Sequence, residues 1–275
     1  MMDALKPRTV GRPGQDQAHG LRQMFAAKAL HFVPLASNPQ VLYGGVVLER
    51  MCAAFAALGF KTLVVDAGER ARVPSELSLF DLSEGIETLS DHVKYMPARG
   101  LPLKCVDARG DSSSLIDLVA SAAVGVDVVI LHASASELVR MLSTRARGYN
   151  LRPLLFTDDS AAGMTQAYTS IKLMSQRGQW FSHDLLVCAD RDSQRGEMVA
   201  QRLAQCADNF LGAAQHAHLL INPMEPATQD PNASFLSMAA DLLTCAWKHR
   251  QVEGGINEHM GKRAALPSRR TPVFN

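Results

Sequence analysis

Residues 28–69 constrain the fold of this chain more than any other stretch. They begin with an apolar run, KALHFVPLA, and continue through a polar loop with one glycine pair, SNPQVLYGGVV. An amphipathic segment, LERMCAAFAALGF, and a second apolar run, KTLVVDAGE, complete the stretch. This order predicts a strand, a loop, a helix and a strand, a crossover unit whose natural product is a parallel sheet. The loop would lie at the carboxyl end of the first strand, where such folds bind phosphate.

Apolar runs and amphipathic segments continue to alternate along the rest of the chain. We expect strands at residues 103–107, 127–132, 151–157, 184–189 and 218–221, and helices at residues 81–96, 112–123, 136–146, 192–210 and 233–247. The run DVVILH is the most apolar of the strands, which is typical of a strand buried on both faces at the centre of a sheet. The pattern predicts an α/β fold, with a mostly parallel, Rossmann-like central sheet and helices on both faces.

The composition fits one large domain with a tail at each end. The chain has 275 residues, and 47% of them are hydrophobic, which is enough for one full core. We expect a flexible basic leader and a short helix in residues 1–27, the α/β domain in residues 28–248, and a basic, disordered tail in residues 249–275.

Charge and hydropathy argue against several classes of function. A net charge of +1 gives no general reason to expect nucleic-acid binding. No apolar run approaches the roughly 20 residues of a membrane span, so we expect membrane association to be peripheral at most. The five cysteines are scattered, without a C-x-x-C pair. That usage favours free thiols and a cytoplasmic protein.

The loop and the second strand resemble the opening of the MinD/ParA family of P-loop ATPases, whose loop has the form K-G-G-x-G-K-[ST]. The family's second strand ends in D-A-D, and here it ends in D-A-G, beginning with Asp66. Counting back from Asp66 places Pro39, which follows Asn38, at the family's signature lysine. Gly44 then stands at the phosphate-gripping lysine, and Gly45 stands at the magnesium-binding serine or threonine.

Other segments resemble the same family but lack the residues with which it binds the nucleotide. The strand at 127–132 resembles the Walker B strand, and His132 stands where a carboxylate holds the magnesium-bound water. Cys188 and Ala189 replace an Asn-Arg pair whose asparagine reads adenine. Residues 165–172, TQAYTSIK, closely match the family's sequence motif T-D-A-Y-x-x-I-K. The resemblance implies a P-loop NTPase-like fold with a degenerate nucleotide site, formed by Asn38, Pro39, Gly44, Gly45, Asp66 and His132.

A short motif precedes the first strand. Residues 16–22 read DQAHGLR, which is similar to the D-Q-A-x-x-L-R element of the FlhG branch of this family, the regulators of flagellar number. In that branch the element docks on the signal-recognition-type GTPase FlhF and stimulates GTP hydrolysis. The resemblance implies a partner-binding helix that uses Asp16, Gln17, Leu21 and Arg22. An ordinary capped helix that packs on its own domain is the alternative.

These features favour a non-catalytic, FlhG-like regulator of flagellar biosynthesis that docks on an FlhF-type GTPase or another flagellar assembly protein. We expect no catalytic residue, no metal and no cofactor, since phosphoryl transfer needs the lysines and the magnesium ligands that the loop lacks. One alternative is a working MinD/ParA-type ATPase with an atypical loop, which would bind ATP and magnesium. Another is a ParA-like accessory protein of a different envelope apparatus.

Two further groups of polar residues have ordinary structural explanations. Asp158 and Asp159 stand between a predicted strand and a helix, where an N-cap and a solvated neighbour are expected. His216 and His218 alternate onto one face of the last predicted strand, which is compatible with a metal, but no third ligand lies nearby in the sequence.

Overall fold

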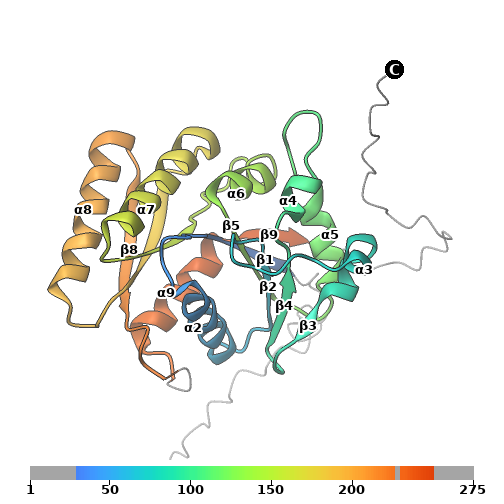
Figure 1. The fold of residues 1–275 in the computed structure, drawn as a ribbon, viewed down its shortest axis with the longest axis horizontal. Coiled ribbons are helices and arrows are strands. Elements are labelled where there is room, and N and C mark those ends of the chain that lie inside the picture. Colours follow the sequence, from blue (N-terminus) through green and yellow to red (C-terminus); the bar gives the residue numbers. More distant parts are fainter. Residues whose placement is uncertain (1–28, 227–229, 251–275) are drawn as a thin grey trace, which may run out of the picture.

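The computed structural model describes residues 29–226 and 230–250, and these form one sheet with helices on both faces (Figure 1). The strands are β1 (Ala29–Ala36), β2 (Thr62–Asp66), β3 (Glu87–Thr88), β4 (Val93–Pro97), β5 (Val128–Ala133), β6 (Leu154–Asp158), β7 (Ser182–Cys188), β8 (Ala214–Ile221) and β9 (Trp247–Arg250). They lie in the order β3-β4-β2-β5-β1-β6-β7-β8, with β9 paired to β1. The β3–β4 and β1–β9 pairs are antiparallel and the others are parallel, so the predicted fold class is confirmed.

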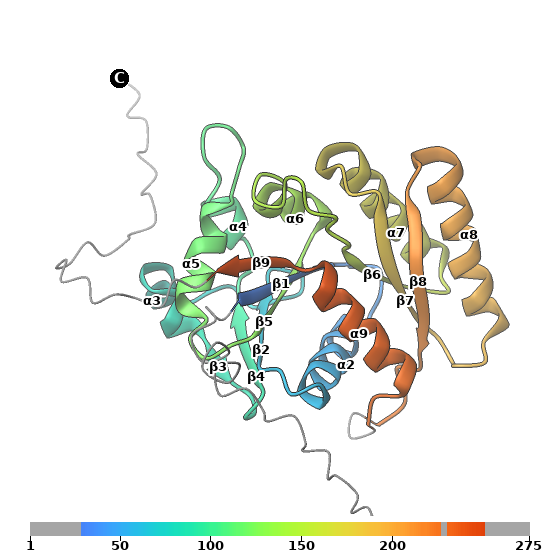
Figure 2. The same cartoon turned by 180° about the vertical axis from the view of Figure 1, so that it is seen from behind.

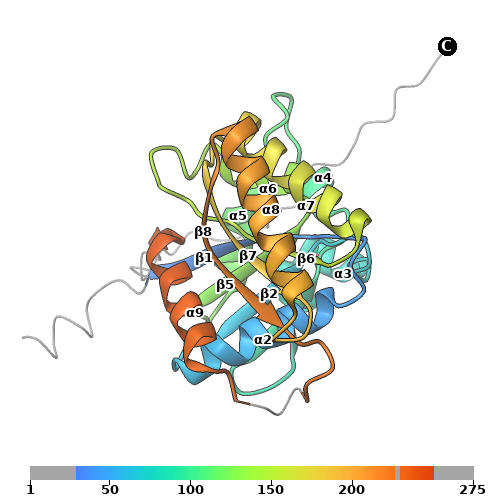
Figure 3. The ribbon, with the colours of Figure 1, turned by 90° about the vertical axis from the view of Figure 1, so that its left-hand side faces the viewer.

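The helices form two layers, seen from behind in Figure 2 and from the side in Figure 3. One face of the sheet carries α2 (Gly44–Ala57) and α9 (Ala233–Cys245), and the other carries α5 (Ser114–Ala122), α6 (Ala135–Leu142), α7 (Ala161–Leu173) and α8 (Gln194–Leu211). Shorter elements are α3 (Glu76–Phe80), a 3₁₀ turn at Leu82–Gly85, α4 (Leu101–Lys104) and a π-helical turn at Met174–Gly178. No helix among the described residues is both long and apolar enough to cross a bilayer.

The central strands are buried on both faces, as their near-continuous apolar sequences require. Successive residues of β1 point to opposite faces, so Phe32 packs in the core under α5 to α8, while Val33 packs in the core under α2 and α9. In β5 the same alternation places Val129 in the first core and Ile130 in the second.

Two predictions between residues 81 and 107 are wrong. The predicted helix at 81–96 is instead the 3₁₀ turn followed by β3 and β4, and Leu89, expected on its buried face, is 62% exposed. Its apolar residues matched a helical period, but β4 pairs along the whole of β2 and so completes the sheet there. The predicted strand at 103–107 is also wrong. Gly100 has a φ of 76°, and Pro102 lies in the first turn of α4, where proline favours a helix start.

The last strand was not predicted. Trp247, expected at the end of a helix, opens β9, which pairs antiparallel with β1 from Phe32 opposite Trp247 to Ala29 opposite Arg250. The Trp247 and Phe32 rings pack with their centroids 5.3 Å apart, and Trp247 is buried. The domain therefore extends slightly past the expected boundary at residue 248. The predicted leader at 1–27 and the tail from residue 251 onward lie outside the described residues.

Replacing Trp247 tests how much β9 contributes to stability. We expect Trp247→Ala to lower the free energy of unfolding by about 3–5 kcal/mol, because it leaves a large cavity against Phe32. The matched control is Phe210→Ala on α8, whose ring is 75% exposed, and whose loss should change stability by less than about 0.5 kcal/mol. Chemical denaturation followed by circular dichroism measures both, and equal losses in the two variants would contradict a structural role for β9.

Candidate functional site

The predicted site residues lie at one edge of the sheet. Because β2, β5 and β1 are parallel neighbours, their carboxyl ends meet at this edge. Asp66 closes β2 directly opposite His132 in β5, and His132 in turn lies opposite Leu35 of β1. The loop at residues 37–43 leaves β1 here and leads into α2, which Gly44 opens. The topology thus gathers the residues that the sequence placed in one degenerate nucleotide site.

Asp66 and His132 form a buried pair at the centre of this edge. Their Oδ1 and Nδ1 atoms are 2.7 Å apart. Asp66 Oδ1 also accepts from the Gly68 N–H at 3.1 Å, and Asp66 Oδ2 accepts from the Tyr95 hydroxyl at 3.0 Å. Both carboxylate oxygens therefore have partners within the protein.

The surroundings of Asp66 keep it ionised. Burial raises its pKa, but the hydrogen bond and charge of His132, with the Gly68 and Tyr95 hydrogen bonds, outweigh burial, so the pKa of Asp66 lies below its ordinary value. Burial, followed by the nearby Asp66 charge, raises the pKa of the Tyr95 hydroxyl to about 12. An ionised carboxylate only accepts hydrogen bonds, so His132 Nδ1 carries a proton. His132 Nε2 is buried and has no hydrogen-bond partner among the described residues.

Asn38 fastens the loop to the neighbouring strand and helix. Its side-chain nitrogen donates to the carbonyl oxygens of Phe156 in β6 and Gly163 in α7, both at 3.0 Å. Its side-chain oxygen accepts from the Gln40 N–H at 3.2 Å, and its carbonyl oxygen accepts from the Val41 N–H at 3.1 Å. Asn38 is buried, so these bonds form in a setting where an unpaired polar group is costly.

Arg70 holds the same loop from its other side. Its guanidinium donates to the carbonyl oxygen of Pro39 at 2.6 Å and to that of Val41 at 3.2 Å. Neither Arg70 nor Tyr95 was predicted as a site residue. No sequence pattern marks them, because their roles depend on where the turn after β2 and the β4 strand lie in space.

A phosphate-binding loop directs successive backbone N–H groups at the anion. In this loop Pro39 has no N–H, the Gln40 N–H bonds to the Asn38 side chain, and the Val41 N–H bonds to the Asn38 carbonyl. The donors left include the Leu42 and Tyr43 N–H groups and those at the start of α2, where the N-cap Tyr43 provides no side-chain cap. The Ser37 hydroxyl, at the start of the loop, donates to Glu69 at 2.9 Å.

The residues present do not fit a magnesium-bound triphosphate. Magnesium requires oxygen ligands in a near-octahedral arrangement, and both Asp66 oxygens already accept hydrogen bonds within the protein. Among the described residues, no cluster of three or more histidine, cysteine, aspartate or glutamate side chains could hold a metal ion. The loop itself contains neither lysine nor arginine.

The other candidates have structural partners. Ser160, rather than Asp158, caps α7 by accepting from the Gly163 N–H at 3.0 Å, while Asp158 accepts from the Ser160 N–H and hydroxyl. Asp159 pairs with Arg195 at 3.2 Å. The two histidines of β8 separate: His216 lies 3.4 Å from Asp184, and His218 lies 2.8 Å from Glu197. The predicted docking residues Asp16, Gln17, Leu21 and Arg22 lie outside the described residues.

No protein-family model matches this sequence, and neither does any curated protein. Solved structures do match. A plasmid partition protein of Borrelia burgdorferi is 10% identical, with a TM-score of 0.52 over 79% of this chain and 97% of its own. A plasmid partition protein from the same organism bound to AMPPNP is 9% identical, with a TM-score of 0.51 over 79% and 98%. The chain has the α/β fold of the ParA/MinD-type P-loop NTPases.

A cobyrinic acid a,c-diamide synthase from Mycobacterium smegmatis shares this fold too. It is 14% identical, with a TM-score of 0.51 over 78% of this chain and 94% of its own. At such low identities the similarity concerns the fold alone. The chemistry of the site has to be argued from this chain's own residues.

The crowding around His132 makes a specific prediction for Gly68. A Cβ at this position would lie 2.7 Å from His132 Cε1, so we expect Gly68→Ala to cost about 1–3 kcal/mol of stability. Gly45→Ala is the matched control, since a Cβ there meets nothing within 4 Å. It should leave stability unchanged or raise it by up to about 1 kcal/mol, because alanine favours a helix. Thermal unfolding of both variants decides this, and a neutral Gly68→Ala would contradict the described packing.

The Asp66 pair predicts a pH dependence. Because its pKa is lowered in the folded state, Asp66 contributes stability that is present above its unfolded pKa of about 4 and lost as pH falls through the lower folded value. We expect Asp66→Asn to be destabilising at neutral pH, by an amount that shrinks below pH of about 4. Denaturation across the acid range measures this, with the exposed Asp91→Asn as control. A deficit that stays constant with pH would contradict an ionised Asp66.

Proposed function

We propose that this chain is a non-catalytic, FlhG-like regulator of flagellar biosynthesis, which docks on an FlhF-type GTPase through residues 16–22. The observation that supports the non-catalytic part is the bonding of the loop at 37–43. The Asn38 side chain bonds to β6 and α7, the Gln40 and Val41 N–H groups bond to Asn38, and Arg70 holds two of the carbonyl groups, so these polar groups are unavailable to a phosphate.

The energetics support the same conclusion. A phosphate-gripping lysine forms charge-assisted hydrogen bonds of about 1.5–3 kcal/mol each, and the loop has no such residue. Phosphoryl transfer relies almost wholly on positioning and charge neutralisation. The one retained carboxylate, Asp66, is engaged with His132, Gly68 and Tyr95. We infer that neither ATP nor magnesium is a cofactor of this protein.

In this proposal docking is independent of the degenerate site. In the sequence, residues 16–22 precede Ala29, the amino end of β1, whereas the loop leaves its carboxyl end. β1 has eight residues, so its two ends lie roughly 25 Å apart. In this proposal Gln17 and Arg22 face the partner's nucleotide site and Leu21 packs against it, while Asp16 caps the helix. The fold then serves as a scaffold for the motif.

A working ATPase is the second candidate, and the fold shared with an AMPPNP-bound partition protein favours it. It would need a cation from outside the loop. Lys61 is unsuitable, since it precedes β2 at the opposite edge, where its N–H bonds to Asp127. A lysine from a second subunit or partner would have to supply the missing charge. A ParA-like accessory role in another envelope apparatus would leave the motif at 16–22 without a function.

Stimulation of an FlhF-type GTPase tests the proposal. We expect Gln17→Ala and Arg22→Ala each to reduce stimulation about tenfold or more, since each removes a hydrogen bond to a charged group worth about 1.5–3 kcal/mol. Gln23→Ala and Arg12→Ala are the matched controls, because they remove the same residue types beside the motif. GTP turnover is measured with full-length protein, and thermal unfolding verifies that each variant folds.

Full stimulation by both motif variants would overturn the docking proposal. An equal loss in all four variants would do so too, because it would indicate a general effect of the leader rather than recognition by the motif.

A further inference from the structure

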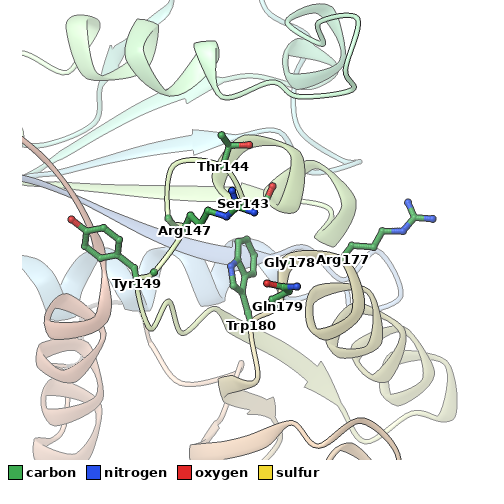
Figure 4. A pocket seen from close by; sticks show the side chains of 10 residues that line it. Ser143, Thr144, Arg147, Tyr149, Arg177, Gly178, Gln179 and Trp180 are labelled. Atoms are coloured by element: carbon green, nitrogen blue, oxygen red, sulfur yellow. The ribbon is translucent and has the colours of Figure 1, made fainter.

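A polar cavity lies away from the degenerate site. It has a volume of about 380 Å³, within the range of small-molecule sites. Two segments line it: the turn that follows α6, and the end of the π-helical turn that follows α7 (Figure 4). The residues are Ser143, Thr144, Ala146, Arg147, Gly148, Tyr149, Arg177, Gly178, Gln179 and Trp180. Both segments stand at the carboxyl ends of their helices, and hence at the edge of the sheet opposite the loop at 37–45.

The backbone at the base of this cavity is unusual. The chain leaves α7 through the π-helical turn Met174–Gly178, a form that often occurs at functional sites. Gln179 follows with a φ of 57°, the one positive value among the described non-glycine residues. Gly178 packs so closely that a Cβ there would lie 3.1 Å from both the Trp180 ring and Val139. The buried Trp180 indole is therefore closely packed at the base of the cavity, with Gln179 beside it.

The cavity carries positive charge that nothing in the described chain neutralises. None of its lining residues is acidic, and Arg147 and Arg177 form no ion pair among the described residues. Two nearby acidic groups are paired with other arginines: Asp117 with Arg145, and Asp184 with Arg152 at 2.7 Å. Asp111 does not line the cavity, but it accepts from the hydroxyl of the lining residue Thr144 and from the Ser113 N–H.

One guanidinium of the cavity is placed to receive an anion. Figure 4 shows the Arg147 guanidinium near Ser143 and one end of the Trp180 ring, while Tyr149 and Arg177 extend to opposite sides. A guanidinium presents a planar fork of donors that suits a phosphate or a carboxylate. The Ser143 hydroxyl adds a neutral donor near this fork. A fork with a further donor near it suits the three terminal oxygens of a phosphate better than the two oxygens of a carboxylate.

We propose that this cavity binds a small organic phosphate, with Arg147 as its main anchor and Arg177 adding positive charge at the rim. The volume accommodates a phosphorylated sugar or a molecule of similar size. The site lies at the opposite edge of the sheet from Asn38 and Asp66, so it is independent of the degenerate nucleotide site. The proposed phosphate site also does not depend on docking to a GTPase.

Trp180 provides the measurement. The chain has two tryptophans, and Trp247 is buried against Phe32, so its signal is a constant background. Full-length protein is titrated with ribose 5-phosphate, with ribose as the phosphate-free control, and tryptophan emission is recorded. We expect a saturable change up to millimolar ribose 5-phosphate and none with ribose. Arg147→Ala should weaken binding about tenfold or more, because it removes a bidentate pair, and Arg177→Ala should weaken it less.

Arg145→Ala is the matched control, since Arg145 lies in the same turn but outside the cavity and pairs with Asp117. It should bind as the unaltered protein does, and thermal unfolding verifies that all variants fold. No saturable change up to millimolar ribose 5-phosphate would overturn the proposal, as would equal binding by Arg147→Ala. A hexaglutamate peptide is titrated in parallel. Binding of that peptide without ribose 5-phosphate would replace the phosphate site with a protein-docking site.

Discussion

Strand β5 pairs with β1 on one side and with β2 on the other, and much of the molecule depends on this double pairing. All three strands are parallel and apolar on both faces, so they require helices above and below the sheet. Their registers bring the ends of β1, β2 and β5 together, which places Asp66 opposite His132. On its other side β1 pairs with β6, which places the loop after β1 beside the Phe156 carbonyl that Asn38 bonds.

At this edge the loop after β1 is held by hydrogen bonds within the fold. A phosphate loop directs successive N–H groups at an anion, whereas the Gln40 and Val41 N–H groups of this loop bond to Asn38. Each such hydrogen bond contributes about 0.5–1.5 kcal/mol net, and Asn38 and Arg70 together form five with this loop, β6 and α7. The Asp66 carboxylate is likewise engaged within the fold, with His132, Gly68 and Tyr95.

The sequence was informative where strands are long and buried, and misleading where a short strand forms at the edge. The crossover at residues 28–69 and the apolar run of β5 predicted the central sheet correctly. β4 was missed because Leu82, Ile86, Leu89 and Val93 follow a helical period, and only pairing with β2 makes the segment a strand. The sequence placed Asp66 and His132 in one site because each stands at the carboxyl end of a predicted parallel strand. It could not reveal Arg70 or Tyr95, which reach the site from a turn and from the unpredicted strand.

The central claim is that the loop at 37–45 cannot bind a nucleotide, and calorimetric titration of the purified protein with ATP and ADP in the presence of magnesium tests it most directly. We expect no saturable heat at high protein concentration, because the loop has no cation and its Gln40 and Val41 N–H groups are bonded to Asn38. Saturable binding in the micromolar range, about 8 kcal/mol of binding free energy, would contradict this. It would mean that the bonds of Asn38 and Arg70 open for the nucleotide and that the protein retains the ligand of the P-loop ATPases.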